Sequence, residues 1–128
     1  MRLLLDTHTF LWWCANDPKL SAAAVAAIGE ASSEVFVSAV SAWEISIKAR
    51  LGKLPLPEPP DVFIAMMVKQ HAFGVLGISL SHAVGEFNLP AHHNDPFDRL
   101  LIAQASYEKL TLVTGDAKIA EYNVQTLW

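Results

Sequence analysis

The chain has 128 residues, of which 52% are hydrophobic and 17% are charged, and its formal net charge is −4. This length predicts one domain over residues 1–128, and the apolar content excludes an intrinsically disordered chain. The negative charge argues against a protein that binds nucleic acid through a basic surface. The single cysteine, Cys14, excludes an internal disulfide. We expect its side chain to act as a small buried hydrophobe.

The sequence also bears on where the protein works. Its apolar runs are far shorter than a bilayer-spanning stretch. At the amino end, Asp6 stands where a signal peptide would continue its apolar region. We therefore expect a soluble, cytoplasmic protein with no contact to a membrane.

In the first half of the chain, short apolar runs alternate with helical patterns. Ser21 is suited to cap a helix, and Gly52 is suited to end one. The segment 54–60 contains four prolines, which exclude a helix or a central strand and predict a surface connection. The predicted elements are strands over residues 2–5 and 35–37 and helices over residues 7–15, 22–31 and 40–50.

The second half continues the alternation. Asp61 is expected to cap a helix that runs to about residue 70, and Pro96 suits the first position of another. The other predicted elements are strands over residues 75–78, 111–114 and 124–127 and helices over residues 79–87, 96–109 and 116–122. Short buried strands that alternate with helices predict an α/β fold, with a short, mostly parallel central sheet flanked by helices.

Five carboxylates adjoin apolar segments that such a fold would bury. An unpaired carboxylate near a core is costly, so it is usually paired, hydrogen-bonded or bound to a metal. Few basic residues lie near these segments in the sequence, which favours a shared divalent cation. In open parallel sheets ligands bind beyond the carboxyl ends of the strands, where two of the five fall. The five residues are Asp6, Glu44, Asp95, Asp98 and Asp116.

Such a cluster indicates a particular chemistry. Mg²⁺ and Mn²⁺ prefer hard oxygen ligands, and two to four converging carboxylates hold one or two such ions. A site of this kind activates water and stabilises an in-line displacement at phosphorus. The pattern therefore favours phosphodiester hydrolysis over zinc chemistry, because it requires no histidine or cysteine ligand.

Each carboxylate also has an ordinary structural explanation. Asp95 precedes Pro96, and we favour the role of helix N-cap for it. The alternatives for the others are a helix cap for Asp6, exposure to solvent for Glu44, a cap or a pair with Arg99 for Asp98, and a turn for Asp116.

Two sets of ring side chains leave their roles open. His92 and His93 stand close to Asp95 and form either a metal or acid–base pair or, as adjacent histidines in a polar loop more often do, packing and solvent contacts. The tryptophans are expected in the core or in dimer contacts more than as platforms for stacked bases. They are Trp12, Trp13, Trp43 and Trp128.

Four segments, taken in order, form a specific pattern. They are residues 3–8 (LLLDTH), 38–45 (SAVSAWEI), 95–105 (DPFDRLLIAQA) and 113–116 (VTGD). Together they resemble the PIN-domain ribonucleases, and most closely the VapC-type toxins of bacterial toxin–antitoxin pairs. The resemblance also includes residues 48–54 and 122–124, so it runs nearly from end to end.

The resemblance implies a single PIN-like domain that acts as a metal-dependent endoribonuclease. The acidic positions of the family match Asp6, Glu44, Asp98 and Asp116, with Asp6 and Asp98 as the main ligands of the first Mg²⁺ or Mn²⁺. Hydrolysis would leave a 5′-phosphate and a 3′-hydroxyl. Lesser roles fall on Thr114, Ser41, Asp95 as an outer partner of the ligands, and Arg99, which either holds a carboxylate or contacts phosphate.

The resemblance also implies partners. They are an RNA substrate, with tRNA or rRNA favoured, a cognate antitoxin that masks the site and binds operator DNA through its own domain, and a second copy in a homodimer.

Three other classes of protein are alternatives to this interpretation. A phosphatase of the haloacid dehalogenase type wants a second acid two residues after Asp6, where His8 stands. A receiver domain wants an acceptor aspartate after the third strand, where the sequence has Ile78-Ser79. The third is a catalytically silent PIN-like module that binds RNA or protein. Metal-dependent RNA cleavage that is lost in Asp6→Asn separates the enzyme from this module.

Overall fold

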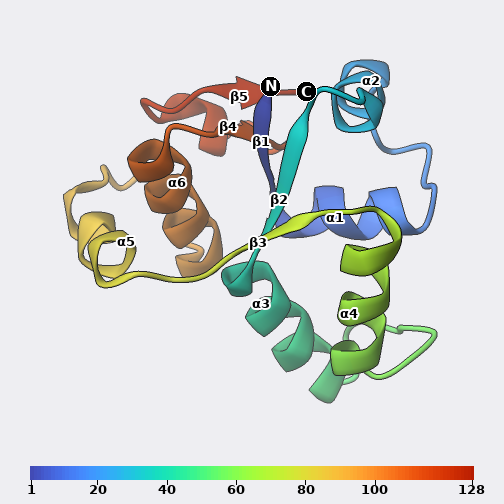
Figure 1. The fold of residues 1–128 in the computed structure, drawn as a ribbon. Helices are drawn as coiled ribbons and strands as arrows, with labels where there is room; N and C mark the ends of the chain where they lie inside the picture. The colour runs from blue at the N-terminus through green and yellow to red at the C-terminus, as the bar shows by residue number, and fades with distance from the viewer.

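Helices and short strands alternate along the chain, as Figure 1 shows. The computed structural model describes all residues from 1 to 128. The elements are β1 (Arg2–Leu5), α1 (Thr7–Cys14), α2 (Ala22–Gly29), β2 (Glu34–Ser38), α3 (Ala39–Arg50), α4 (Pro60–Gln70), β3 (Gly74–Leu76), α5 (Leu80–Gly85), the 3₁₀ turn η1 (Glu86–Asn88), α6 (Pro96–Glu108), β4 (Thr111–Val113), the 3₁₀ turn η2 (Ile119–Glu121) and β5 (Thr126–Leu127).

The five strands form one sheet in the order β3-β2-β1-β4-β5, and every neighbouring pair is parallel. The predicted α/β fold with a parallel central sheet is therefore confirmed. Leu5 at the end of β1 pairs with Val37 of β2 and with Val113 of β4. Because the strands run in the same direction, Asp6 and Thr114 follow the carboxyl ends of neighbouring strands, at one edge of the sheet.

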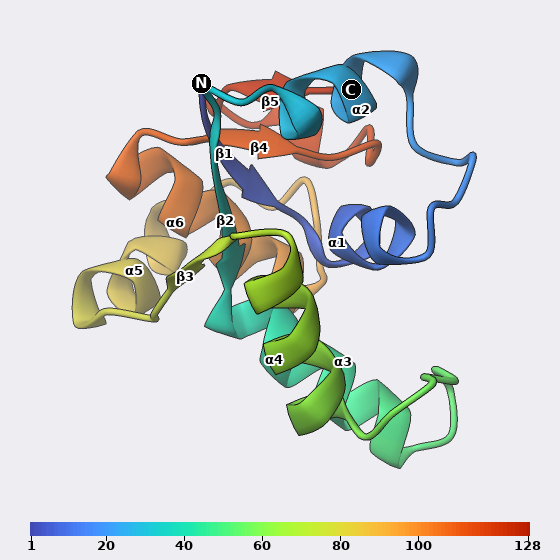
Figure 2. The same cartoon turned by 45° about the vertical axis from the view of Figure 1, so that its right-hand side comes forward.

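The central strand β1 is buried on both faces, because successive side chains of a strand point to opposite sides. Leu3 and Leu5 join the core under α1, α2 and α4, with Phe10 among its buried members. Leu4 joins the other core, with residues of α6 such as Leu101. Figure 1 shows α5 and α6 on one side of the strands and α1 and α2 on the other. Figure 2 shows that α3 and α4 project together beyond the sheet.

Helix α6 is tied to the sheet by a fully buried amide. Gln104 accepts a hydrogen bond of 2.5 Å from the hydroxyl of Ser38, at the end of β2, and donates one of 3.1 Å to the carbonyl of Gly77. Ser38 in turn accepts from the backbone N–H of Val40 and so caps α3. These bonds fix the start of α3 and the axis of α6 relative to the same strand end.

Several elements are shorter than the sequence predicts. The alanine-rich helix ends at Gly29, the third strand at Leu76, and the last strand has only two residues. The helix predicted over 116–122 is a 3₁₀ turn at Ile119–Glu121, because the Asp116 carboxylate binds the backbone N–H of Lys118 and holds the chain in a turn. The cap predicted at Asp61 is wrong: Pro59 precedes α4, and Asp61 lies in its first turn.

The structure also tests what the sequence predicts for Cys14 and for a membrane-spanning helix. Cys14 is partly buried and packs against the core, which agrees in part with the expected small buried hydrophobe, and burial raises the pKa of its thiol to about 12. None of the helices combines the length and the apolar character that crossing a membrane requires.

Candidate functional site

Three of the predicted carboxylates meet at one cavity of about 380 Å³. Asp6 follows β1 and is 5% exposed, Asp116 follows β4, and Asp98 lies in the first turn of α6. Asp6 also caps α1, because its Oδ1 accepts a hydrogen bond of 2.8 Å from the backbone N–H of Thr9. Asp6 therefore has both predicted roles, because its carboxylate caps a helix and also lines the cavity.

The position of Asp98 depends on its neighbour in the sequence. Asp95 caps α6, with its Oδ1 2.8 Å from the backbone N of Phe97 and 3.1 Å from that of Asp98. Pro96 occupies the first turn, as expected. The predicted N-cap at Asp95 is confirmed, and its effect is to fix the turn from which Asp98 reaches the cavity.

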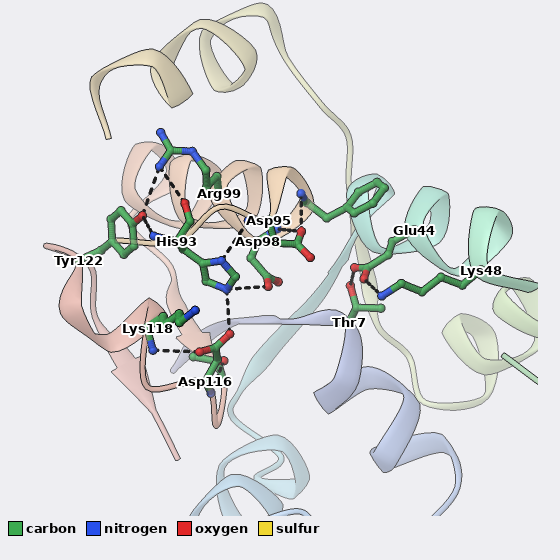
Figure 3. A network of polar contacts seen from close by, with 12 residues as sticks. Thr7, Glu44, Lys48, His93, Asp95, Asp98, Arg99, Asp116, Lys118 and Tyr122 are labelled. Carbon is green, nitrogen blue, oxygen red and sulfur yellow. Dashed lines mark hydrogen bonds and ion pairs between the residues drawn. The ribbon is translucent and has the colours of Figure 1, made fainter. Parts of the chain in front are cut away.

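His93 joins the carboxylates, a role that the sequence left open. Its Nε2 lies 3.0 Å from Oδ2 of Asp98 and 2.9 Å from Oδ2 of Asp116 (Figure 3). Its Nδ1 accepts a hydrogen bond of 3.1 Å from the backbone N–H of Asp95. Because Nδ1 accepts this hydrogen bond, a neutral ring carries its proton on Nε2, which donates to the carboxylates. His93 reaches the carboxylates because it lies in the loop before α6, where its backbone N–H donates a hydrogen bond to the hydroxyl of Tyr122.

Glu44 forms a second group beside the first (Figure 3). It is 3% exposed, and both of its carboxylate oxygens are bound. The hydroxyl of Thr7 donates to Oε1 over 2.6 Å and also lies 3.0 Å from the hydroxyl of Ser41. Lys48, one turn later on α3, forms an ion pair with Oε2. The hydrogen bond with Glu44 is the main reason that the pKa of Lys48 is raised.

Thr114 and Arg99 shape the surroundings of the site. Thr114 Oγ1 accepts a hydrogen bond of 3.0 Å from the backbone N–H of Asp116 and so sets the turn after β4. The Arg99 guanidinium donates to the Glu86 carboxylate over 2.5 Å and to the carbonyl of Pro90 over 2.8 Å. It therefore holds the loop that carries His93 and does not line the cavity.

The carboxylates repel one another, and Asp98 shows it most. Burial raises the pKa of Asp98 to about 7, helped by the negative charges of Asp95, Glu44 and Asp6 and only partly opposed by His93. Burial acts on Asp116 in the same direction, but the hydrogen bonds from His93 and from the N–H of Lys118 outweigh it and lower the pKa of Asp116.

This donor set fits a hard divalent cation. Carboxylate oxygens of Asp98 and Asp116 lie within 4.8 Å of each other, and Asp6 lines the same cavity. Burial is the main cause of the raised pKa of Asp98, and repulsion by the other carboxylates adds to it. A cation would offset both effects, because an opposite charge favours the ionised carboxylate. The expectation that few basic residues lie near the carboxylates is wrong for Glu44, which forms an ion pair with Lys48. The sequence does contain one signal for Lys48, its spacing of four residues from Glu44 on a helix.

Asp98 should make the metal-free protein less stable as pH rises. The folded state keeps a proton up to about pH 7, which an unfolded aspartate loses near its ordinary pKa of 3.8. The unfolded state therefore binds fewer protons between these values, and the free energy of unfolding falls as pH rises through them. Asp98→Asn removes this effect. In EDTA at pH 8 the variant should melt at least a few degrees above the wild type (roughly 2–8 °C per kcal/mol), and the difference should vanish near pH 4.

The matched control is Asp61→Asn on the exposed side of α4, which should leave the melting temperature nearly unchanged. Saturating Mn²⁺ should raise the melting temperature of the wild type at pH 8 and not that of Asp98→Asn. Equal melting of wild type and Asp98→Asn in EDTA at pH 8 would contradict the assignment.

The chain is similar to known proteins over nearly its whole length. The model of the PIN domain family matches residues 3–125. Ribonuclease VapC22 of Mycobacterium tuberculosis is 32% identical over 121 residues, which cover 94% of this chain and 91% of that protein.

Solved structures share the fold at low identity. VapBC2 from Rickettsia felis, bound to a DNA fragment from its promoter, has a TM-score of 0.72 at 14% identity and covers 99% of this chain and 98% of its own. VapBC-1 from nontypeable Haemophilus influenzae has a TM-score of 0.65 at 16% identity, and the match covers 99% of this chain and 97% of that chain. The chain therefore belongs to the PIN-domain family and, within it, to the VapC group.

Proposed function

We propose that this protein is a metal-dependent endoribonuclease, the toxin of a type II toxin–antitoxin pair. The observation that carries the proposal is the convergence of Asp6, Asp98 and Asp116 on one cavity at the carboxyl edge of the sheet. The named activity of the VapC22 relative, a ribonuclease, supports it. The substrate would be a phosphodiester bond of structured RNA, such as tRNA or rRNA, and the site of action the cytoplasm.

One or two Mg²⁺ or Mn²⁺ ions would be held by Asp6, Asp98 and Asp116, with Glu44 completing the site. Carboxylate oxygens are the ligands that these ions prefer. A bound ion would supply Lewis-acid chemistry, because it lowers the pKa of water and offsets negative charge on phosphoryl oxygens. The products would carry a 5′-phosphate and a 3′-hydroxyl, without attack by the 2′-hydroxyl.

The other polar residues would keep these ligands in place. Asp95 fixes the turn that carries Asp98, and Thr114 fixes the turn that carries Asp116. The N–H of His93 bridges the two carboxylates and so holds them close together against their repulsion. Thr7 and Ser41 orient Glu44, while Lys48 offsets its charge. Such outer partners of metal ligands typically contribute 10–100-fold to metal affinity or activity.

The direct test is cleavage of RNA. With Mn²⁺ or Mg²⁺, purified protein free of antitoxin should cut total RNA or tRNA into discrete fragments that end in a 5′-phosphate. EDTA should abolish the cleavage. Asp98→Asn should lower the rate at least a hundredfold, since removing groups that stabilise transition-state charge has effects of this order.

Asp61→Asn is the control and should cut at the wild-type rate, because Asp61 is exposed on α4. A 2′,3′-cyclic phosphate product would rule out metal-activated water as the nucleophile. Absence of cleavage with either metal would favour the alternative, a catalytically silent module that binds RNA or protein.

Two protein partners belong to the proposal. The structural relatives are VapBC proteins, which supports a cognate antitoxin that inhibits the enzyme, and contact with operator DNA would occur only through that antitoxin. A homodimer is supported by large apolar side chains that are exposed along β3, α5 and η1. They are Val75, Ile78, Leu80, Val84 and Phe87, and Leu80 and Phe87 are more than 80% exposed. Contiguous exposed apolar side chains mark interaction surfaces.

The dimer predicts a mass of about 28 kDa in solution, twice the chain mass of 14.0 kDa. Size-exclusion chromatography with light scattering at micromolar concentration measures it. Phe87→Glu places a charge on the exposed apolar surface and should give 14 kDa, whereas Val25→Glu on α2, also exposed, should stay dimeric. A wild-type mass of 14 kDa would contradict the dimer.

A further inference from the structure

The cavity with the carboxylates has a second wall, which the proposed hydrolysis does not use. Trp12, Lys19 and Trp128 line it together with His8. The rings of Trp12 and Trp128 have centroids 5.9 Å apart and are tilted by 54°. The Lys19 ammonium lies 5.7 Å from the centre of the Trp12 ring. Aromatic faces and one cation therefore stand beside the groups that would hold the metal. Trp12 also packs against the core, as expected for the tryptophans, whereas Trp128 is 40% exposed at the cavity.

The place of Trp128 is built into the turn after β4. A Cβ atom at position 115 would lie 2.8 Å from Cε2 of the Trp128 ring, closer than real contacts allow. Only glycine at this position lets the indole lie against the backbone next to Asp116. The glycine thus sets an aromatic ring beside a carboxylate of the site.

The wall is accessible. The Trp128 side chain is 40% exposed, and that of Lys19 is 68% exposed. The ion pair of Lys19 with Asp17 is 4.0 Å long and open to solvent, so it stabilises little and leaves the ammonium available. An aromatic surface and a cation at one site are the two features with which proteins bind single-stranded nucleic acid.

We propose, on the basis of the nuclease function above, that Trp128 and Trp12 form a stacking subsite for one unpaired RNA base, with Lys19 placed for a neighbouring phosphate. A base reaches this wall only if it has left a helical stack, so the subsite selects loops and other single-stranded segments. Stacking accepts any base, since each has a π-face. An apolar helix of a protein partner would fit the adjacent groove better, because that groove is mostly apolar and has no cation in its lining, which includes Leu11, Leu54, Leu56 and Phe63.

The test measures RNA binding without cleavage. All variants are made in an Asp98→Asn background, which the proposed mechanism makes inactive. Binding of a fluorescein-labelled octaadenylate is followed by anisotropy in Mg²⁺. Trp128→Leu should weaken binding about tenfold or more, as stacking on one side chain is worth about 1–3 kcal/mol. Lys19→Gln should weaken binding and lower the slope of log K against log salt by about 0.7, the value for one phosphate contact in a single strand.

Two controls tie the loss to stacking. Trp43→Leu removes an indole that is 57% exposed on α3 and lies outside the cavity, so affinity should not change. Trp128→Phe keeps an aromatic face and should restore most of the affinity. A series of octamers carries one abasic residue at each position in turn. At one position the abasic residue should weaken binding to the parent tenfold. At the same position it should not weaken binding to Trp128→Leu.

The outcomes separate this proposal from the nuclease function. If the parent binds RNA and Trp128→Leu binds it equally well, or if no abasic position matters, the subsite is overturned while the nuclease function stands. If Trp128→Leu loses affinity for the antitoxin and not for RNA, the wall serves a protein and the proposal is overturned as well. If the parent binds no octaadenylate, the subsite is overturned, and the nuclease function is decided separately by the cleavage assay on total RNA and tRNA.

Discussion

The gathering of partly and fully buried carboxylates, which repel one another, is the constraint on which this structure depends. Glu44 is compensated by Lys48 and Thr7, and Asp116 by His93 and a backbone amide. Asp95 is compensated by the amides of the helix that it caps. Asp98 has a raised pKa, mainly because it is partly buried and also because Asp95, Glu44 and Asp6 lie near it, and its contact with His93 offsets this only in part. Negative charge that the protein leaves uncompensated is the feature that calls for a cation.

The fold accepts this repulsion because its supports come from buried, rigid parts. Asp6 follows the central strand, which is buried on both faces, and its carboxylate also caps α1. Gln104 ties α6 to the end of β2, and Arg99 holds the loop before α6. Each carboxylate therefore belongs to an element that packing fixes independently. The site is assembled by the sheet and its helices, and a mobile loop alone could not hold like charges so close together.

Part of this arrangement could be predicted from the sequence because it follows from local rules. A parallel sheet places the residues after its strands at one edge, which brought Asp6 and Asp116 together in the prediction. Asp95 before Pro96 has the pattern of a helix cap, and the structure has that cap. Of the four acidic residues that the sequence resemblance points to, Asp6, Asp98 and Asp116 line the cavity, and Glu44 does not.

Other features depend on contacts between distant segments, which no local pattern encodes. His93 reaches Asp116 only through the path of the loop and its bond to Tyr122. Trp128 lies beside Asp116 because Gly115 lacks a side chain. Element lengths were overestimated where a side chain competes with the helix, as Asp116 does by binding the N–H of Lys118.

Direct titration with Mn²⁺ tests the central claim, that these carboxylates form a metal site. Isothermal titration calorimetry of the wild type at pH 7.5 should show saturable binding of one or two ions per chain. Asp6→Asn should weaken that binding at least tenfold, and Asp61→Asn should leave it unchanged. Absence of saturable binding, or equal affinity in the wild type and Asp6→Asn, would contradict the account.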